Sequence, residues 1–408
     1  MMEVIEIKKG GSFEVGRQML LQRQRDSKSN TDKNVEAMHN VVGLKGLDQQ
    51  TSAALNRNTV LRLVRRYGPI SRAQLWKQSR LGHSTIAKII RDLQKANLLI
   101  EAGQAESSGG KRAELLALNS CAKCTIVVIW DTRTIALVNL LSQVRIRRTI
   151  SASVNEKVSA EVVKAIAGAV EDLLAECNIA KSDVLGLGLL LAGDIDQTTG
   201  TVVVSGPLCW ADVPIKSMLE ESVQLRVYPE RALHAIAMGE YLYGAGQRGG
   251  NIAAVAVGPG AIGASLIVDG KILRGKHNCS GEIGHIPVME NGPTCRCGNQ
   301  GCLEAVLAEL LKDGLNEGIL ERLAYYISLG VAFVVNTIDP ETVILCGSII
   351  EDGGDKLMKL VLGFTKRMFF GCSPRQVLIT KGELGQMAAI KGICGFINEK
   401  VFHSEAPC

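Results

Sequence analysis

The chain has 408 residues, of which 46% are hydrophobic and 21% charged, and its net charge is +5. This length exceeds a single hydrophobic core and indicates two or three domains. No apolar run reaches the length of a transmembrane helix, and the N-terminal sequence lacks the apolar stretch of a signal peptide. We therefore expect a cytoplasmic protein with no membrane partner, whose twelve cysteines are metal ligands or buried thiols rather than disulfides.

The first 119 residues divide into two parts. Residues 1–50 contain a polar run at 23–34 with too little apolar surface to fold, and we expect a mobile tail there. In residues 51–119, apolar residues at helical spacing predict three short helices. Ser71 is expected to cap the second helix, and His83 or Ser84 the third, after a turn at Leu81-Gly82. This arrangement predicts a helix-turn-helix.

A candidate wing follows the three helices. Two glycines precede Lys111 and Arg112 next to an apolar strand, which is typical of a β-hairpin tip that contacts the DNA backbone or minor groove. A basic surface loop is the alternative. Residues 56–119 carry twelve basic and four acidic side chains, a net charge of +8, which favours a polyanionic partner. We predict winged helix-turn-helix binding to a double-stranded DNA operator. The expected DNA-binding residues are Ser71, Arg72, His83, Ser84, Thr85, Lys88, Arg91, Lys111 and Arg112.

Residues 120–408 read as an α/β body. Apolar segments of strand length occur first in succession and then alternate with amphipathic helices, and this order occurs twice. Such a pattern suits two lobes, each built from a sheet and helices, with a cleft between them.

The most specific chemistry lies in residues 281–304, GEIGHIPVMENGPTCRCGNQGCLE. This segment contains His285, Cys295, Cys297 and Cys302, and three thiolates with one imidazole complete a tetrahedral zinc shell. Ordinary reduced cysteines are the alternative, but three within eight residues, with a histidine ten residues upstream, favour a metal. Because protein ligands fill all four positions, we expect structural zinc.

GEIGH and CRCGNQGCLE resemble the signature of the ROK family, which comprises bacterial sugar kinases and sugar-responsive repressors, including those of the N-acetylglucosamine and xylose type. The order of helices and basic wing is similar to the N-terminal domain of the repressors. The resemblance implies an α/β fold in which a winged helix-turn-helix precedes a two-lobed, actin-like ATPase fold of the ribonuclease H type. It also implies that Glu282, His285 and Glu304 bind sugar hydroxyls, while His285 binds zinc through its other ring nitrogen.

Two departures from the kinase pattern argue against phosphoryl transfer. The family's kinases hold ATP through a glycine-bearing turn near the start of the body. The counterpart here is Asp131-Thr132-Arg133-Thr134, and no glycine occurs between residues 110 and 168. The aspartate that accepts the sugar proton is matched by Ala232, although Glu230 lies two residues away. A later turn, Gly258–Gly263, keeps its glycines, but a tight β-hairpin also needs them.

We therefore expect a regulator of sugar metabolism, a repressor, that senses a sugar or sugar phosphate and is not an enzyme. Because an operator of two-fold symmetry is bound by two DNA-binding domains, we expect a homodimer or tetramer. Two alternatives remain open at this point: a regulator without any small-molecule ligand, and an active ATP-dependent sugar kinase.

Overall fold

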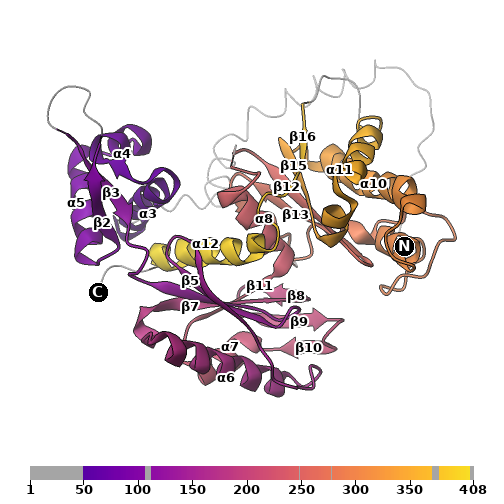
Figure 1. The fold of residues 1–408 in the computed structure, drawn as a ribbon, viewed down its shortest axis with the longest axis horizontal. Helices are drawn as coiled ribbons and strands as arrows, with labels where there is room; N and C mark the ends of the chain where they lie inside the picture. Colours follow the sequence, from indigo (N-terminus) through magenta and orange to yellow (C-terminus); the bar gives the residue numbers. More distant parts are fainter. Residues whose placement is uncertain (1–48, 106–111, 248, 277, 370–375, 405–408) are drawn as a thin grey trace, which may run out of the picture. The chain divides into compact units, whose positions relative to one another are not determined.

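The computed structural model describes residues 49–105, 112–247, 249–276, 278–369 and 376–404 (Figure 1). Residues 54–408 form one compact unit, and of the chain before it only the beginning of one helix is described. The tail expected at residues 1–50 lies outside the described residues, except for its last two.

Three helices and a three-stranded antiparallel sheet form the N-terminal part of the compact unit (Figure 1). Apolar side chains at helical spacing bury one face of each helix, and Leu75, Ile90 and Leu116 are fully buried in their common core. All three helices lie where the apolar spacing predicts them. The elements are α3 (Gln49–Tyr67), β1 (Ile70–Ser71), α4 (Arg72–Ser79), α5 (His83–Lys95), β2 (Leu99–Gln104) and β3 (Glu114–Leu118), with sheet order β1-β3-β2.

The two predicted helix caps have different outcomes. Ser71 caps α4 through a capping box, because its hydroxyl accepts from the Gln74 amide at 3.2 Å and its own amide donates to the Gln74 side chain at 2.9 Å. The prediction that His83 or Ser84 caps α5 was wrong. The helix begins one residue earlier, and Gly82, in an extended conformation without a capping side chain, takes the N-cap position. Glycine is an accepted N-cap, so no side-chain acceptor is needed there.

The remainder of the unit contains two five-stranded mixed sheets, and the strands of both sheets are arranged in the same relative order. In each sheet, three successive strands pair antiparallel and two later strands join in parallel. The expected α/β class, with strands in succession and then alternating with helices twice, is confirmed. Sheet 1 has the order β11-β7-β4-β5-β6, with β4 (Cys124–Ile129), β5 (Thr134–Asn139), β6 (Val144–Thr149), β7 (Val184–Leu191) and β11 (Val227–Arg231). Sheet 2 has the order β14-β13-β12-β15-β16, with β12 (Ile252–Gly258), β13 (Ala261–Val268), β14 (Lys271–Ile272), β15 (Thr342–Cys346) and β16 (Leu378–Lys381).

A small sheet and seven helices complete the described body. The small sheet, β10-β9-β8, consists of β8 (Asp194–Asp196), β9 (Thr201–Ser205) and β10 (Trp210–Val213). The helices are α6 (Ser159–Cys177), α7 (Ile215–Val223), α8 (Ala232–Tyr243), α9 (Leu303–Leu311), α10 (Leu320–Ile338), α11 (Ser348–Thr365) and α12 (Met387–Ser404). Three short 3₁₀ turns lie at Lys181–Asp183, Ile283–His285 and Glu317–Ile319.

Helices cover both faces of each sheet, because the strands direct apolar side chains alternately to the two sides. In β4, Ile126 and Val128 pack with α6 and α7, whereas Val127 packs with α12. In β12, Val255 packs with α9, α10 and α11, whereas Ala254 packs with α8. Helices α8 and α12, which pack on each other, therefore lie between sheet 1 and sheet 2 (Figure 1).

Glycines allow α8 and α12 to pack closely. A Cβ atom at Gly239 of α8 would lie 2.0 Å from the carbonyl oxygen of Ala388. A Cβ atom at Gly392 of α12 would lie 1.8 Å from the carbonyl oxygen of Ala235. Both distances are impossible for a real side chain, so any larger residue would push the two helices apart.

Helix α10 is long and apolar enough to cross a membrane, but in this fold it belongs to the core. Of its most apolar window, 56% is buried, and Leu323, Ile327 and Val331 are fully enclosed. It is the one such helix in the described part of the chain.

Candidate metal centre and ligand site

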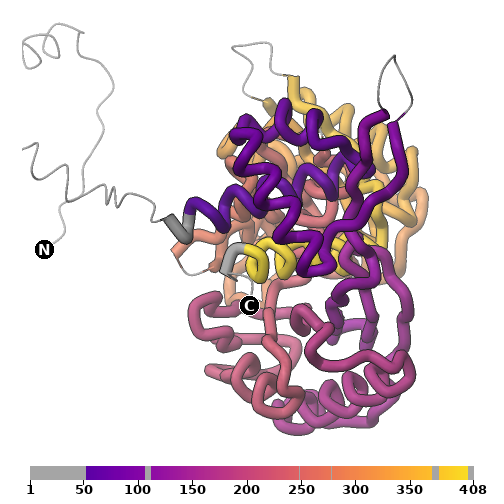
Figure 2. Tube along the Cα trace, turned by 90° about the vertical axis from the view of Figure 1, so that its left-hand side faces the viewer, coloured from indigo at the N-terminus to yellow at the C-terminus, as the bar shows by residue number. Residues whose placement is uncertain are grey.

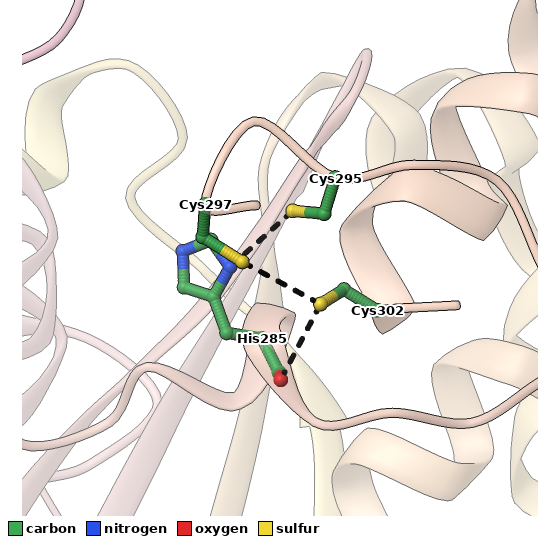
Figure 3. A group of neighbouring side chains, drawn as sticks. All are labelled: His285, Cys295, Cys297 and Cys302. Atoms are coloured by element: carbon green, nitrogen blue, oxygen red, sulfur yellow. Dashed lines mark hydrogen bonds between the residues drawn. The ribbon is translucent and has the colours of Figure 1, made fainter. Parts of the chain in front are cut away.

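The four predicted metal ligands come together beside α9 (Figure 3). His285 ends a 3₁₀ turn, Cys295 and Cys297 lie in the loop that follows, and Cys302 immediately precedes α9. One ligand atom from each residue lies within 4.8 Å of the others. The loop therefore brings together the residues that the sequence pattern grouped.

Two distances within this cluster match edges of a tetrahedral zinc shell. Bonds of about 2.3 Å to sulfur and about 2.0–2.1 Å to nitrogen place two sulfurs roughly 3.8 Å apart, and a sulfur and a nitrogen roughly 3.6 Å apart. In the structure, Sγ of Cys297 and Sγ of Cys302 are 3.7 Å apart, and Sγ of Cys295 is 3.5 Å from Nδ1 of His285. A disulfide needs about 2.05 Å, so the spacing fits a metal shell and not a cystine.

Backbone geometry fixes the shape of this loop. Gly301 adopts a φ of +68°, and a Cβ atom there would lie 1.8 Å from the carbonyl oxygen of Met289. The amide of Leu303 donates to the carbonyl of Ile286 at 2.9 Å, which joins the end of the loop to its beginning. Ile283 and Leu303 are 4% and 0% exposed, so the core under sheet 2 holds both ends.

The three thiols differ in acidity for local reasons. A hydrogen bond from the Asn299 backbone lowers the pKa of Cys297 to about 7, and this thiol is exposed. Burial raises the pKa of Cys295 to about 12 and also raises the pKa of Cys302. Cys297 is thus the thiol that ionises most readily, and the two buried thiols need a nearby cation to ionise.

The three predicted sugar contacts, Glu282, His285 and Glu304, adjoin this cluster, but both carboxylates already have partners. Glu304 is 5% exposed, and its two oxygens accept hydrogen bonds from Arg296 at 3.0 and 3.1 Å. Oε1 of Glu282 accepts a hydrogen bond from Arg231. Nε2 of His285 lies 3.9 Å from the other oxygen of Glu282, so one ring nitrogen faces this carboxylate while the other faces the thiols.

Sequence reasoning missed both arginines. Arg296 lies between Cys295 and Cys297 in the sequence, and Arg231 lies between Glu230 and Ala232. The available signal was a basic residue next to acidic or metal-binding residues, and for Arg231, whose side chain is only 19% exposed, burial requires a nearby carboxylate.

A second polar cluster surrounds Glu230, which is 1% exposed. Its carboxylate interacts with Nδ1 of His234 at 2.9 Å and accepts a hydrogen bond from Arg274 at 3.0 Å. Burial raises the pKa of Glu230, but the hydrogen bonds from His234 and Arg274 outweigh burial and hold it at about 2. A carboxylate so firmly ionised is a poor proton acceptor. Ala232 itself has no group that could accept a proton.

The two glycine-dependent phosphate turns of a kinase have other roles here. Residues 131–134 form the turn between β4 and β5, where the Arg133 guanidinium covers the Trp130 ring at 3.9 Å and pairs with Glu156 at 2.5 Å. Gly258–Gly263 includes the two-residue hairpin between β12 and β13, and Gly260 takes the positive φ of +68° that this turn requires. Hairpin geometry therefore explains Gly260, whereas Gly258 and Gly263 have no positive φ.

The predicted DNA-binding residues of the helices concentrate on one element. His83, Ser84, Lys88 and Arg91 are exposed on α5, and Thr85 is half-buried. Trp76 of α4, which the sequence analysis did not include, is 46% exposed and stacks on His83 with ring centroids 4.5 Å apart.

The other predicted DNA-binding residues lie around α4 and the hairpin. Ser71 is 6% exposed and its hydroxyl belongs to the capping box, so its side chain serves the fold of α4. Arg72 pairs with Glu114 of β3 at 3.1 Å. Arg112 is exposed, and Lys111 lies outside the described residues.

Four of the twelve basic side chains of residues 56–119 contact the body. They lie on α3, and their partners belong to α12, to α8 and to the turn after α8 (Figures 1 and 2). The pairs are Arg62 with the Glu399 carboxylate at 2.6 Å, Arg57 with the Phe402 carbonyl at 3.2 Å, Arg65 with the Tyr243 hydroxyl at 3.3 Å and Arg66 with the Gln247 carbonyl at 2.9 Å. The charge available to a polyanion is therefore smaller than the count of +8.

A cavity of about 770 Å³ lies elsewhere, between β6 and α6. Arg148, Glu161 and Lys164 line it together with apolar residues such as Ile150 and Leu173. It contains none of the predicted site residues, so it is separate from the metal cluster.

The sequence model of the ROK family matches residues 131–316. The xylose repressor of Bacillus spizizenii is 30% identical over 331 residues, which are 74% of this chain and 85% of the relative. A solved ROK family transcriptional regulator, described as a homologue of the Escherichia coli Mlc protein, covers 86% of this chain and 97% of its own, with a TM-score of 0.71 and 22% identity. A ROK hexokinase from Thermus thermophilus covers 66% of this chain and 96% of its own, with a TM-score of 0.55 and 24% identity. At these identities, the two structures establish similarity of fold.

Proposed function

This chain belongs to the ROK family, and we propose that it is a transcriptional regulator of sugar metabolism that binds operator DNA and does not transfer phosphate. In this proposal, residues 51–119 form a winged helix-turn-helix domain, and residues 120–408 form a two-lobed, actin-like body. Residues 1–50 precede both as a tail. The protein acts in the cytoplasm as a repressor and assembles as a homodimer or tetramer.

The exposed face of α5 is the observation that supports DNA binding most strongly. Recognition helices contact bases with their N-terminal residues, and α5 presents His83, Ser84 and Lys88 there behind the short turn from α4. The antiparallel pairing of β2 with β3 supports the proposal of a wing that contacts phosphates, and Lys111 belongs to the sequence that connects the two strands. The hexokinase match leaves about a third of this chain uncovered, whereas the match to a regulator extends over 86% of it.

Structural zinc is the metal that best fits the Cys/His cluster. Three sulfurs and one imidazole nitrogen leave no open position for substrate, which is typical of structural sites. Bound zinc would cross-link the loop that carries Glu282 to the start of α9, which carries Glu304. The metal would therefore fix the distance between the two carboxylates of the ligand site.

The body resembles a kinase that has lost its chemistry and kept a ligand site. Phosphoryl transfer needs a phosphate-binding turn and a base, but Arg133 fills the first turn, Ala232 replaces the base and Glu230 is locked in an ion pair. Glu282, His285 and Glu304 remain together as hydroxyl-binding groups. We propose that a sugar or sugar phosphate binds there and alters the affinity for DNA.

One observation favours a second candidate, a regulator whose body binds no small molecule. The pairs Arg231–Glu282 and Arg296–Glu304 satisfy both carboxylates without any ligand. Such a body would serve dimerisation or the docking of another protein.

Selection of genomic DNA fragments by the purified full-length protein tests these alternatives. We expect a small set of sites with two-fold symmetry, release of DNA by at least one sugar of a panel, and ATP turnover at background in a coupled assay across common hexoses. ATP-dependent phosphorylation of a hexose would contradict the non-enzymatic assignment. Site-specific DNA binding that no sugar affects would favour the ligand-free regulator.

A further inference from the structure

Arg231 connects two parts of the body at the ligand site. It is the last residue of β11 in sheet 1, and its guanidinium donates to the Glu282 carboxylate and, at 3.0 Å, to the carbonyl of Asn278. Both acceptors lie in the segment after β14, the last strand of the sheet 2 hairpins. One side chain thus holds together groups from the two sheets.

Neighbouring contacts hold the same segment without Arg231. Arg274 pairs with Glu230 of β11, whose carboxylate is almost fully buried. The Asn278 side chain donates to the carbonyl of Ile195 in β8 at 2.9 Å. Glu230 and Asn278 are 1% and 7% exposed, so these contacts are enclosed and hold the segment independently of the Arg231–Glu282 pair.

The Arg231–Glu282 pair differs from the enclosed Arg274–Glu230 pair in two respects. It is more open, with 19% of the Arg231 side chain and 37% of the Glu282 side chain exposed. A second carboxylate is also at hand, because Oδ1 of Asp194 in β8 lies 3.8 Å from the Arg231 guanidinium. Arg231 therefore has two carboxylates within reach: Glu282 in the segment after β14, and Asp194 in β8.

We propose that Arg231 is an exchangeable counter-ion that an uncharged sugar displaces from Glu282 onto Asp194. This proposal rests on the proposed ligand site at Glu282, His285 and Glu304. Without ligand, Arg231 occupies an oxygen of Glu282 that a pair of sugar hydroxyls would use. When those hydroxyls bind Glu282, Arg231 pairs with Asp194, and no guanidinium is left without a counter-ion.

Charge balance determines which sugars fit. The exchange conserves charge, because one arginine–carboxylate pair forms as another breaks. A sugar acid or sugar phosphate held at this position would place a third anion beside Asp194 and Glu282 around a single arginine, and like charges at such distances repel. The Arg231 position therefore selects neutral sugars over anionic ones.

The test measures sugar binding by calorimetry on the full-length protein and three variants. The probes are D-xylose, D-glucose and N-acetyl-D-glucosamine as neutral sugars, D-glucuronate as a sugar acid and D-glucose 6-phosphate as a sugar phosphate. Arg231→Asn should bind its neutral sugar roughly three- to fivefold more tightly, because Glu282 is then free of a partly exposed ion pair that competes with the sugar. Asp194→Asn should bind roughly three- to fivefold more weakly, because the displaced arginine has lost its second partner.

The double variant separates indirect from direct contact. In the Arg231→Asn background, Asp194→Asn should change neutral-sugar affinity by less than twofold, since that variant has no guanidinium at position 231 that could pair with Asp194. A further loss in that background would show that Asp194 contacts sugar itself, and the exchange would be overturned. If Arg231→Asn does not fold, as judged by circular dichroism, the single Asp194→Asn variant still decides the matter, because unchanged affinity there overturns the proposal.

Other outcomes separate this inference from the proposed function. Binding of a neutral sugar that Arg231→Asn weakens would overturn the exchange and leave the sugar-sensing function intact. Tighter binding of glucuronate or glucose 6-phosphate than of any neutral sugar, lost in Arg231→Asn, would instead identify Arg231 as an anion receptor and overturn the proposal. Absence of sugar binding by every protein would overturn both the exchange and the sugar site, while DNA binding, measured separately, would still stand.

Discussion

Replacing Cys297 by serine should destabilise the body by far more than the loss of an exposed sulfur explains. Structural zinc contributes on the order of 10–16 kcal/mol in small zinc-binding domains, and one of four ligands then accounts for roughly 3–4 kcal/mol. For the body of residues 120–408, an unfolding entropy of about 2.1 cal/mol/K per residue converts that loss into a Tm decrease of roughly 5–7 °C. Cys297 is exposed in the structure, so packing contributes little to this number.

Cys209→Ser is the matched control. Cys209 is also exposed, and it lies outside the Cys/His cluster. Substitutions at such surface positions usually change stability by less than about 0.5 kcal/mol, which corresponds to a Tm change within about 2 °C here. The difference between the two serine variants therefore measures the metal bond.

Elemental analysis and thermal melts of the two variants and the wild type provide the assay. We expect one zinc per wild-type chain and per Cys209→Ser chain, with reduced zinc and a lowered Tm in Cys297→Ser. Wild-type protein purified without zinc, or a Cys297→Ser variant that melts together with Cys209→Ser, would refute the four-ligand site.

Four further predictions follow from the contacts described above. Lys88→Ala should weaken operator binding several-fold and flatten its salt dependence, whereas Arg62→Ala should do so much less because Arg62 pairs with Glu399; equal losses in anisotropy titrations would contradict this. Glu230 has a folded pKa of about 2 against an ordinary 4.5, so its stabilising effect is complete above about pH 4.5 and is lost as pH falls toward 2. The Tm advantage of wild type over Glu230→Gln should accordingly shrink below pH 4.5, and a difference constant from pH 7 to pH 3 would argue against the buried ion pair. Ala232→Asp alone should leave sugar phosphorylation at background, because the turn at 131–134 still lacks glycine; measurable turnover in a coupled assay would show otherwise. Sedimentation at micromolar protein should show a dimer or tetramer, and monomer alone would rule out paired heads.

Local chemistry explains which features could be read from the sequence. The strands and helices were predictable because apolar periodicity follows directly from which face of an element is buried. The metal cluster was predictable because its ligands lie within eighteen residues of chain, so the loop itself brings them together. Ser71 was correctly identified as a cap for the same reason, since its partner Gln74 is three residues away.

Contacts between distant residues could not be read in this way. Arg231 and Glu282 are 51 residues apart, and Arg62 and Glu399 belong to opposite ends of the compact unit. A count of charges assigns Arg62 to the DNA-binding surface, because a sequence shows that a guanidinium is present and not where its carboxylate lies. The expectation that Glu282 binds sugar hydroxyls had the same limitation, because packing of two sheets brings Arg231 to that carboxylate, whereas the partner of Glu304, Arg296, lies only eight residues away.

Helix α8 gives a physical route between the ligand site and the DNA-binding head. It begins at the residue after Arg231 and ends at Tyr243, whose hydroxyl contacts both Ser142 and Arg65 of α3. Twelve residues at about 1.5 Å each make an element roughly 18 Å long. Because Gly239 and Gly392 leave no space between α8 and α12, a tilt of α8 also moves α12, which carries Glu399. In the proposed function, a shift of Arg231 on sugar binding would act on the arginine contacts of α3 through two packed helices, and it would supply the difference in contacts that ligand-dependent release of DNA requires.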